Sequence, residues 1–171
     1  MSKEKSLSET TTSAEIDYSG RPFGYLNPDR ETAMICHQDA AIRDNISKAI
    51  KELNFDVVEP STFKEALRYM RFHIFNVIVI DENFDTDTWE VNYVLNYIEN
   101  LITPVRRQIF VVLISETYPT MDNMRAYNKS VNLVINKKEI AEATIILKKE
   151  IAENTDFYYL FKESIRKFGK I

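Results

Sequence analysis

Three residues that could together accept a phosphoryl group follow three separate apolar runs. Asp81 follows FNVIVI, Ser115 follows IFVVLI, and Lys137 follows LVI with one residue, Asn136, between them. A carboxylate can act as the nucleophile, an ammonium can neutralise the developing charge, and a hydroxyl can hydrogen-bond a phosphoryl oxygen. Each residue alone has a plainer interpretation: Asp81 as a loop acid or helix cap, Ser115 as a structural hydroxyl, and Lys137 as the ion-pair partner of Asp81. The chemistry requires all three to meet at one place.

The elements that would bring them together alternate along the chain. Apolar runs predict strands at 33–36, 55–58, 75–80, 109–114 and 133–135. Helical spacing between them predicts helices at 39–53, 61–70, 91–101 and 120–129, and a long one from 139. Such alternation predicts an α/β fold, a doubly wound five-stranded parallel sheet with helices on both faces and an extended C-terminal helix. Ligands bind at the carboxyl ends of such strands, so His37, Gln38 and Asp39 join the candidate set.

This arrangement resembles the receiver domain of bacterial two-component response regulators over roughly residues 32–152. IVIDENF, LISET and SVNLVINKKE carry the resemblance through Asp81, Ser115 and Lys137, and HQDAAIR matches the family's first loop. The resemblance implies a flavodoxin-like (βα)5 fold, Asp81 as the phosphoacceptor, and Ser115 and Lys137 as phosphate contacts. It also implies signal transduction, with a histidine kinase or a scaffold protein as partner.

The first loop departs from the family pattern. The family's acidic pair, which holds Mg²⁺ together with the phosphoacceptor, falls on His37 and Gln38. Mg²⁺ prefers carboxylate oxygens, so the only remaining metal-binding pair would be Asp39 with Asp81, if the loop shifts by one position. Without the metal, phosphoryl transfer should be slow. The family's switching aromatic falls on Val134, and Lys138 replaces the usual proline. We therefore expect a degenerate pseudo-receiver that holds no resident cofactor.

The C-terminal segment carries a second signal. Apolar residues repeat at spacings of four and three from Ile140 to Phe168, with Asn154 on the seam. A continuous helix of that length would span about 43 Å and project beyond the sheet. The seam residues that would then form a partner helix, in a homodimer for instance, are Ile151, Asn154, Tyr158, Phe161 and Ile165. The alternative is a break at 154–156, with Thr155 capping a second helix that folds back.

Composition limits the other possibilities. The 171 residues carry a net charge of −4, which gives no general attraction to nucleic acid or anionic membranes. No apolar run is long enough to span a bilayer, and no secretory signal is evident. The single cysteine excludes a disulfide within the chain. Together these features favour the cytoplasm. Residues 1–17 are predicted to be a disordered tail, 18–31 an irregular lead-in, 32–152 the receiver-like domain, and 153–171 a helical extension.

Three functions follow from these observations. The first is a stand-alone, non-enzymatic signalling module that acts through protein contacts, with weak or no Mg²⁺-dependent phosphorylation. The second is a competent response regulator phosphorylated on Asp81. The third is a flavodoxin-like protein that binds a small ligand, although the predicted strand ends lack the glycines that would let backbone amides approach a phosphate. Hydrolase motifs are absent.

Overall fold

The computed structural model describes residues 30–86 and 91–168. The predicted tail (1–17) and nearly all of the lead-in (18–31) lie outside these residues. None of the helices in the described part of the chain combines the length and the hydropathy that a membrane crossing needs.

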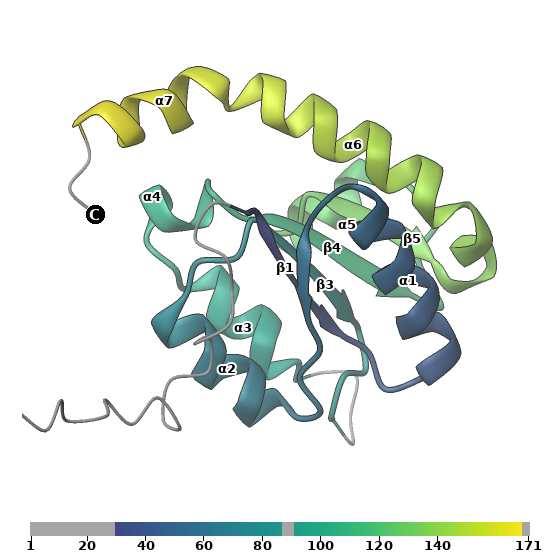
Figure 1. Ribbon diagram of the computed structural model, residues 1–171. Coiled ribbons are helices and arrows are strands. Elements are labelled where there is room, and N and C mark those ends of the chain that lie inside the picture. Colours follow the sequence, from purple (N-terminus) through teal and green to yellow (C-terminus); the bar gives the residue numbers. More distant parts are fainter. Residues whose placement is uncertain (1–29, 87–90, 169–171) are drawn as a thin grey trace, which may run out of the picture.

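Five parallel strands form one sheet, in the order β2-β1-β3-β4-β5 (Figure 1). This arrangement confirms the doubly wound parallel sheet expected from the sequence. The bounds of the strands are β1 Thr32–Cys36, β2 Asp56–Val58, β3 Val77–Asp81, β4 Phe110–Ser115 and β5 Leu133–Asn136.

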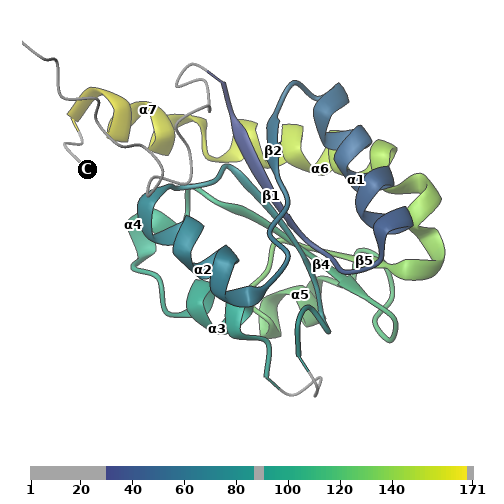
Figure 2. The same cartoon turned by 60° about the horizontal axis from the view of Figure 1, so that its bottom comes forward.

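Helices cover both faces of the sheet (Figures 1 and 2). α1 and α6 cover one face, and α2, α3 and α5 cover the other. The bounds are α1 Ala40–Glu52, α2 Phe63–Phe72, α3 Tyr93–Glu99, α4 Thr103–Arg106, α5 Asn123–Asn128, a 3₁₀ helix Lys137–Glu142, α6 Ala143–Phe157 and α7 Tyr159–Phe168.

The strands are apolar at successive positions because both of their faces are buried. In β3, Val77 and Val79 pack with the helices α1 and α6, whereas Ile78 and Ile80 pack with α2, α3 and α5. A strand that alternates between two buried layers must be apolar throughout. The sheet therefore has two cores, and its carboxyl edge collects the polar residues that end each strand.

Helix starts follow local capping chemistry. Asp39 caps α1 as predicted, since its carboxylate accepts the N–H groups of Ala41 and Ile42. The prediction that Pro60-Ser61 opens the next helix was early, because Thr62 is the cap and α2 begins at Phe63. α4 was not predicted.

The C-terminal helix is interrupted, but at a different residue from the one considered. α6 ends at Phe157, Tyr158 leaves helical geometry, and α7 follows. Thr155 caps no helix; its hydroxyl donates to the carbonyl of Ile151 inside α6, which satisfies the polar group without breaking the helix. α7 does not reverse direction; it continues past the end of α6 and lies close to α4 (Figure 1).

The side chains predicted to form a partner helix are half-buried rather than exposed to solvent. They are Ile151, Asn154, Tyr158, Phe161 and Ile165. Ile151 packs against the α1–α6 core, and the guanidinium of Arg107 lies 5.7 Å from the centre of the Phe161 ring. The side chains that α6 and α7 expose near their junction belong to a different stripe, which includes Phe157 and Leu160.

Candidate functional site

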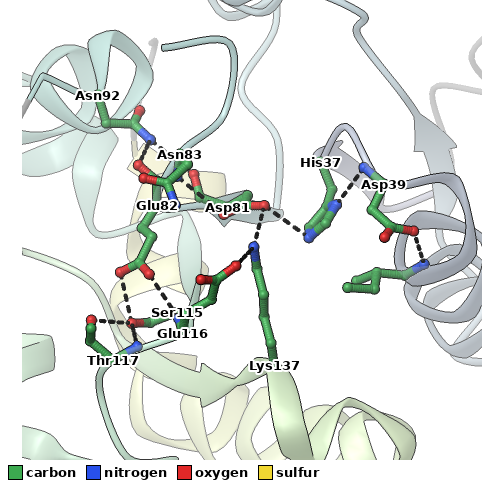
Figure 3. A network of polar contacts seen from close by, with 11 residues as sticks. His37, Asp39, Asp81, Glu82, Asn83, Asn92, Ser115, Glu116, Thr117 and Lys137 are labelled. Carbon is green, nitrogen blue, oxygen red and sulfur yellow. Dashed lines mark hydrogen bonds and ion pairs between the residues drawn. The ribbon is translucent and has the colours of Figure 1, made fainter. Parts of the chain in front are cut away.

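Asp81 lies at the carboxyl end of β3, with a carboxylate that is surrounded by donors (Figure 3). Its Oδ2 atom lies 3.1 Å from Nζ of Lys137 and 3.0 Å from Nε2 of His37. Its Oδ1 atom accepts the N–H of Asn83 at 3.1 Å. The structure thus brings together the third-strand acid, the fifth-strand lysine and the first-loop histidine, which the sequence placed at separate strand ends.

The backbone of Asp39 fixes the orientation of the His37 ring. The backbone N–H of Asp39 donates to Nδ1 of His37 at 3.0 Å, so this nitrogen must be unprotonated. The proton of the neutral ring is therefore on Nε2, which faces Asp81. His37 is almost fully buried. It presents an N–H donor at the position where a metal-binding receiver would present a carboxylate.

These contacts control the charges of the site. Burial tends to raise the pKa of Asp81, but the contacts with His37, the N–H of Asn83 and Lys137 outweigh it and hold the pKa below its usual range. For Lys137, burial tends to lower the pKa, but the carboxylates of Glu116 and Asp81 raise it overall. The site is therefore a buried anion paired with a shared cation at neutral pH.

Ser115 reaches the site only indirectly. Its hydroxyl donates to Oε2 of Glu82 at 2.7 Å and accepts the N–H groups of Thr117 and Tyr118. Glu82 also accepts the N–H of Glu116 at 2.7 Å, so it ties the loops after β3 and β4 together (Figure 3). The sequence analysis did not single out Glu82, although its position directly after Asp81 was a usable signal.

Asn92 connects the end of β3 to the start of α3, and the sequence analysis did not single it out either. Its side-chain N–H₂ group donates to the carbonyls of Asp81 and Glu82 at 3.0 and 3.2 Å. Its side-chain oxygen accepts the N–H groups of Val94 and Leu95, which caps α3. An Asn just before a helical pattern is a recognisable cap, but its bonds to the β3 end depend on the course of the loop.

The residues around Asp81 do not fit a magnesium ion. Gln38 is exposed, and Asp39 uses its carboxylate to cap α1, pointing away from Asp81 (Figure 3). The nearest first-loop group is the His37 N–H, which repels a cation. Within residues 30–86 and 91–168, no three His, Cys, Asp or Glu side chains are grouped so that they could hold a metal ion.

Val134 and Lys138 stand at the two positions that the resemblance assigns to the family's switching aromatic and proline. Val134 is fully buried in β5 against the α2–α3–α5 core. A small branched side chain in this place has no alternative exposed position of the kind that an aromatic ring has. Lys138 follows Lys137 in a 3₁₀ helix, where its N–H donates to the Asn136 side chain.

Solved structures share this fold at low sequence identity. A CheY-like receiver domain from Methanospirillum hungatei matches with a TM-score of 0.57 and 15% identity over 74% of this chain and 98% of that one. A response regulator from Thermotoga maritima matches with a TM-score of 0.54 and 18% identity over 72% and 98%. The chemotaxis response regulator CheY4 of Vibrio cholerae matches with a TM-score of 0.56 and 12% identity over 71% and 98%.

No family model and no curated protein matches the sequence. The solved structures nevertheless confirm the resemblance to receiver domains that the motifs suggested, because the chain has the CheY-like, flavodoxin-like α/β fold.

Proposed function

We propose that this receiver-fold chain is a non-enzymatic signalling module that acts through protein contacts, with weak or no Mg²⁺-dependent phosphorylation. The observation that carries the proposal is the His37–Asp81 contact of 3.0 Å, with the ring oriented by the Asp39 backbone. A phosphoryl donor brings several negative charges to Asp81, and here no second carboxylate is placed to hold the Mg²⁺ that would offset them.

The hydrogen bonds of the site support a structural role for Asp81. Its Oδ1 atom accepts the Asn83 N–H, its Oδ2 atom lies 3.1 Å from Nζ of Lys137 and 3.0 Å from Nε2 of His37, and the Ser115 hydroxyl is committed to Glu82. An acid so satisfied links three strand ends and is a poor nucleophile, because its lone pairs are engaged and its pKa is lowered. In this proposal the carboxylate fixes the shape of the loops that a partner contacts.

Exposed apolar side chains give that partner a surface. Met121, Met124 and Tyr127 are all well exposed on α5 and the turn before it. Exposed methionines and aromatics are common at protein interfaces. A histidine kinase or a scaffold protein is the partner class that the fold suggests. The expected homodimer through the Ile151–Ile165 seam would first require the seam to leave the domain.

The test is phosphorylation in vitro. The purified chain is incubated with Mg²⁺ and acetyl phosphate, and its intact mass is followed. We expect no phosphorylated species in the wild type and a phosphorylated species in the double variant His37→Asp/Gln38→Asp, which restores the acidic pair. Both proteins are checked by circular dichroism, and Asp81→Asn in each background is the control for the site of modification.

The second candidate function is a competent phosphoacceptor, which the Asp81–Lys137 contact favours because that ammonium could neutralise a phosphoryl oxygen. Stoichiometric, Mg²⁺-dependent modification of the wild type that disappears in Asp81→Asn would overturn the first proposal in favour of this one.

A further inference from the structure

A groove with an apolar floor and an acidic rim opens between α3 and the loops that lead to α5. It encloses about 740 Å³, within the size range of sites that bind ligands. Leu95, Leu113 and Tyr118 give it apolar surface. The acidic residues that line it are Glu82, Glu99 and Glu116.

The acidity of the groove is only partly neutralised. Glu82 accepts hydrogen bonds from the Ser115 hydroxyl and a backbone N–H, which are uncharged donors. Glu116 shares the Lys137 ammonium with Asp81. Glu99 is exposed and forms no ion pair with any residue that the structure describes. Lys129 is the one cation among the lining residues. The groove therefore suits a basic, amphipathic segment.

α7 is such a segment. Its exposed apolar side chains include Leu160 and Phe168, at 78% and 85% exposure, and Phe157 just before the break is 80% exposed. Its charged residues are Lys162, Glu163, Arg166 and Lys167, so three cations against one anion leave a net charge of +2. Within α7, Leu160 and Phe168 are eight residues apart, which places them on one side of the helix, whereas Phe157 lies before the break at Tyr158.

The α7 helix of a molecule is on the wrong side to enter its own groove. α6, from which α7 continues, packs with α1 on one face of the sheet. The groove is lined by residues of α3 and of the loop after β4, and α3 and α5 lie on the other face of the sheet (Figure 2). Only the α7 of another molecule can reach it.

We propose that the exposed apolar side of the basic helix α7 docks into the acidic groove of a second copy of this chain, giving head-to-tail association. The apolar side chains of Leu160 and Phe168 contact the groove floor, and Lys167, which lies beside them on the helix, faces the acidic residues of the groove. Lys162 and Arg166 lie on the opposite side of α7 and act through the net charge of the helix. This is a helix-in-groove contact, in which a few apolar anchors fix the register. Because groove and helix are different surfaces, each molecule keeps one of each free, and the contact extends into chains.

Pairing of α7 with α7 of a second molecule is the competing arrangement. It would bring two helices of net charge +2 together, whereas the groove offers the opposite charge. This association does not depend on whether Asp81 is phosphorylated, so the association and the proposed signalling function can be disproved separately.

Sedimentation of the full-length chain at low salt tests the association. We expect an average mass that rises with concentration past the dimer and falls back towards the monomer when salt is added, because exposed charge pairs are screened. A monomer at all concentrations, or a mass that stops at the dimer, overturns the proposal.

Two variants separate the head-to-tail from the symmetric arrangement. Glu99→Lys disables the groove, and Leu160→Glu combined with Phe168→Glu disables the helix. Each should be a monomer alone, but the mixture should form a 1:1 dimer that grows no further, because one intact groove and one intact helix remain. If Glu99→Lys associates like the wild type, or the mixture stays monomeric, the proposal is wrong.

Matched controls place the same changes elsewhere. Glu52→Lys reverses an exposed charge on α1, and Ile145→Glu alters a side chain on α6 that is 75% exposed. Both should associate like the wild type. Circular dichroism and the urea midpoint of every variant should match the wild type, since all the altered side chains are exposed.

Discussion

His37 and Asp81 face each other with side chains that are 2% and 8% exposed, and 3.0 Å separates Nε2 from Oδ2. A buried carboxylate is costly unless neighbouring polar groups compensate for the lost water, and here the imidazole ring is one such neighbour. The pair replaces the cation-binding arrangement with a neutral donor and a carboxylate. Its consequences for stability and for metal binding can be measured.

The first prediction concerns a carboxylate at position 37. His37→Asp replaces the imidazole with a second buried anion beside Asp81, so we expect the free energy of unfolding to fall by about 2–4 kcal/mol at neutral pH. Mg²⁺ should recover part of this loss, because it binds only the folded pair of acids. Thermal unfolding with and without Mg²⁺ measures the effect.

The wild type should show no stabilisation by Mg²⁺ in the same experiment, and His37→Asp/Asp81→Asn should lose the response. If Mg²⁺ stabilises the wild type as strongly as His37→Asp, the first loop already supplies metal ligands and our account of the site is wrong.

The second prediction concerns acid unfolding. The contacts of Asp81 hold its folded-state pKa below its usual value. A depressed pKa means that the carboxylate contributes stability above its unfolded-state pKa of about 3.9, and that this contribution is lost as pH falls through the folded-state value. Asp81→Asn lacks this contribution, so its stability should fall less steeply than that of the wild type below about pH 5.

Urea unfolding at a series of acidic pH values measures both curves. Glu65, whose pKa is also lowered, is common to both proteins and cancels in the comparison. If the unfolding free energies of the two proteins fall in parallel with pH, the contacts of Asp81 contribute no stability.

The third prediction concerns Asn92, which makes four hydrogen bonds at the base of the site. Asn92→Ala removes a helix cap and leaves two buried carbonyls without their donor, so we expect a loss of about 2–3 kcal/mol in unfolding free energy. Asn92→Asp keeps the cap acceptor and should lose less. Asn100→Ala, at an exposed helix end, should change stability by about 0.5 kcal/mol or less. Equal losses at positions 92 and 100 would contradict this role.

The fold could be predicted because its signals are local. The apolar runs at 75–80 and 109–114 required burial on both faces, and Asp39 marked a helix start by its residue type alone. The meeting of Asp81 and Lys137 followed from the parallel sheet, since the carboxyl ends of all its strands share one edge, although β4 lies between β3 and β5.

The contacts of the site were harder to predict because they depend on side-chain direction. Ser115 ends the right strand, but its hydroxyl turns to Glu82 rather than to Asp81. The sequence placed His37 at the metal position without revealing that the Asp39 N–H would fix its tautomer. The helix break at Tyr158 was likewise missed, because a tyrosine is not a helix breaker by type.

The fourth prediction concerns the proposed boundary of the domain. α7 contributes no buried residue, so deleting residues 159–171 should lower the unfolding free energy by about 1 kcal/mol or less. Deleting 143–171 removes Leu147, which is fully buried against α1, and should prevent stable folding. Urea titration of both truncated proteins measures this. If the shorter deletion unfolds the chain, the folded unit extends through α7.

The fifth prediction concerns Cys36, the single thiol of the chain, at the end of β1 beside the site. It is fully buried, and burial raises its pKa, so the native protein has almost no reactive thiolate. Reaction with a disulfide reagent should therefore proceed only through unfolding, at least about 10³-fold slower than in the denatured chain. The rate should rise with urea as the unfolded fraction does. A native-state rate within tenfold of the denatured rate would instead mean that β1 opens locally next to His37, which would conflict with the fixed ring that our account of the site requires.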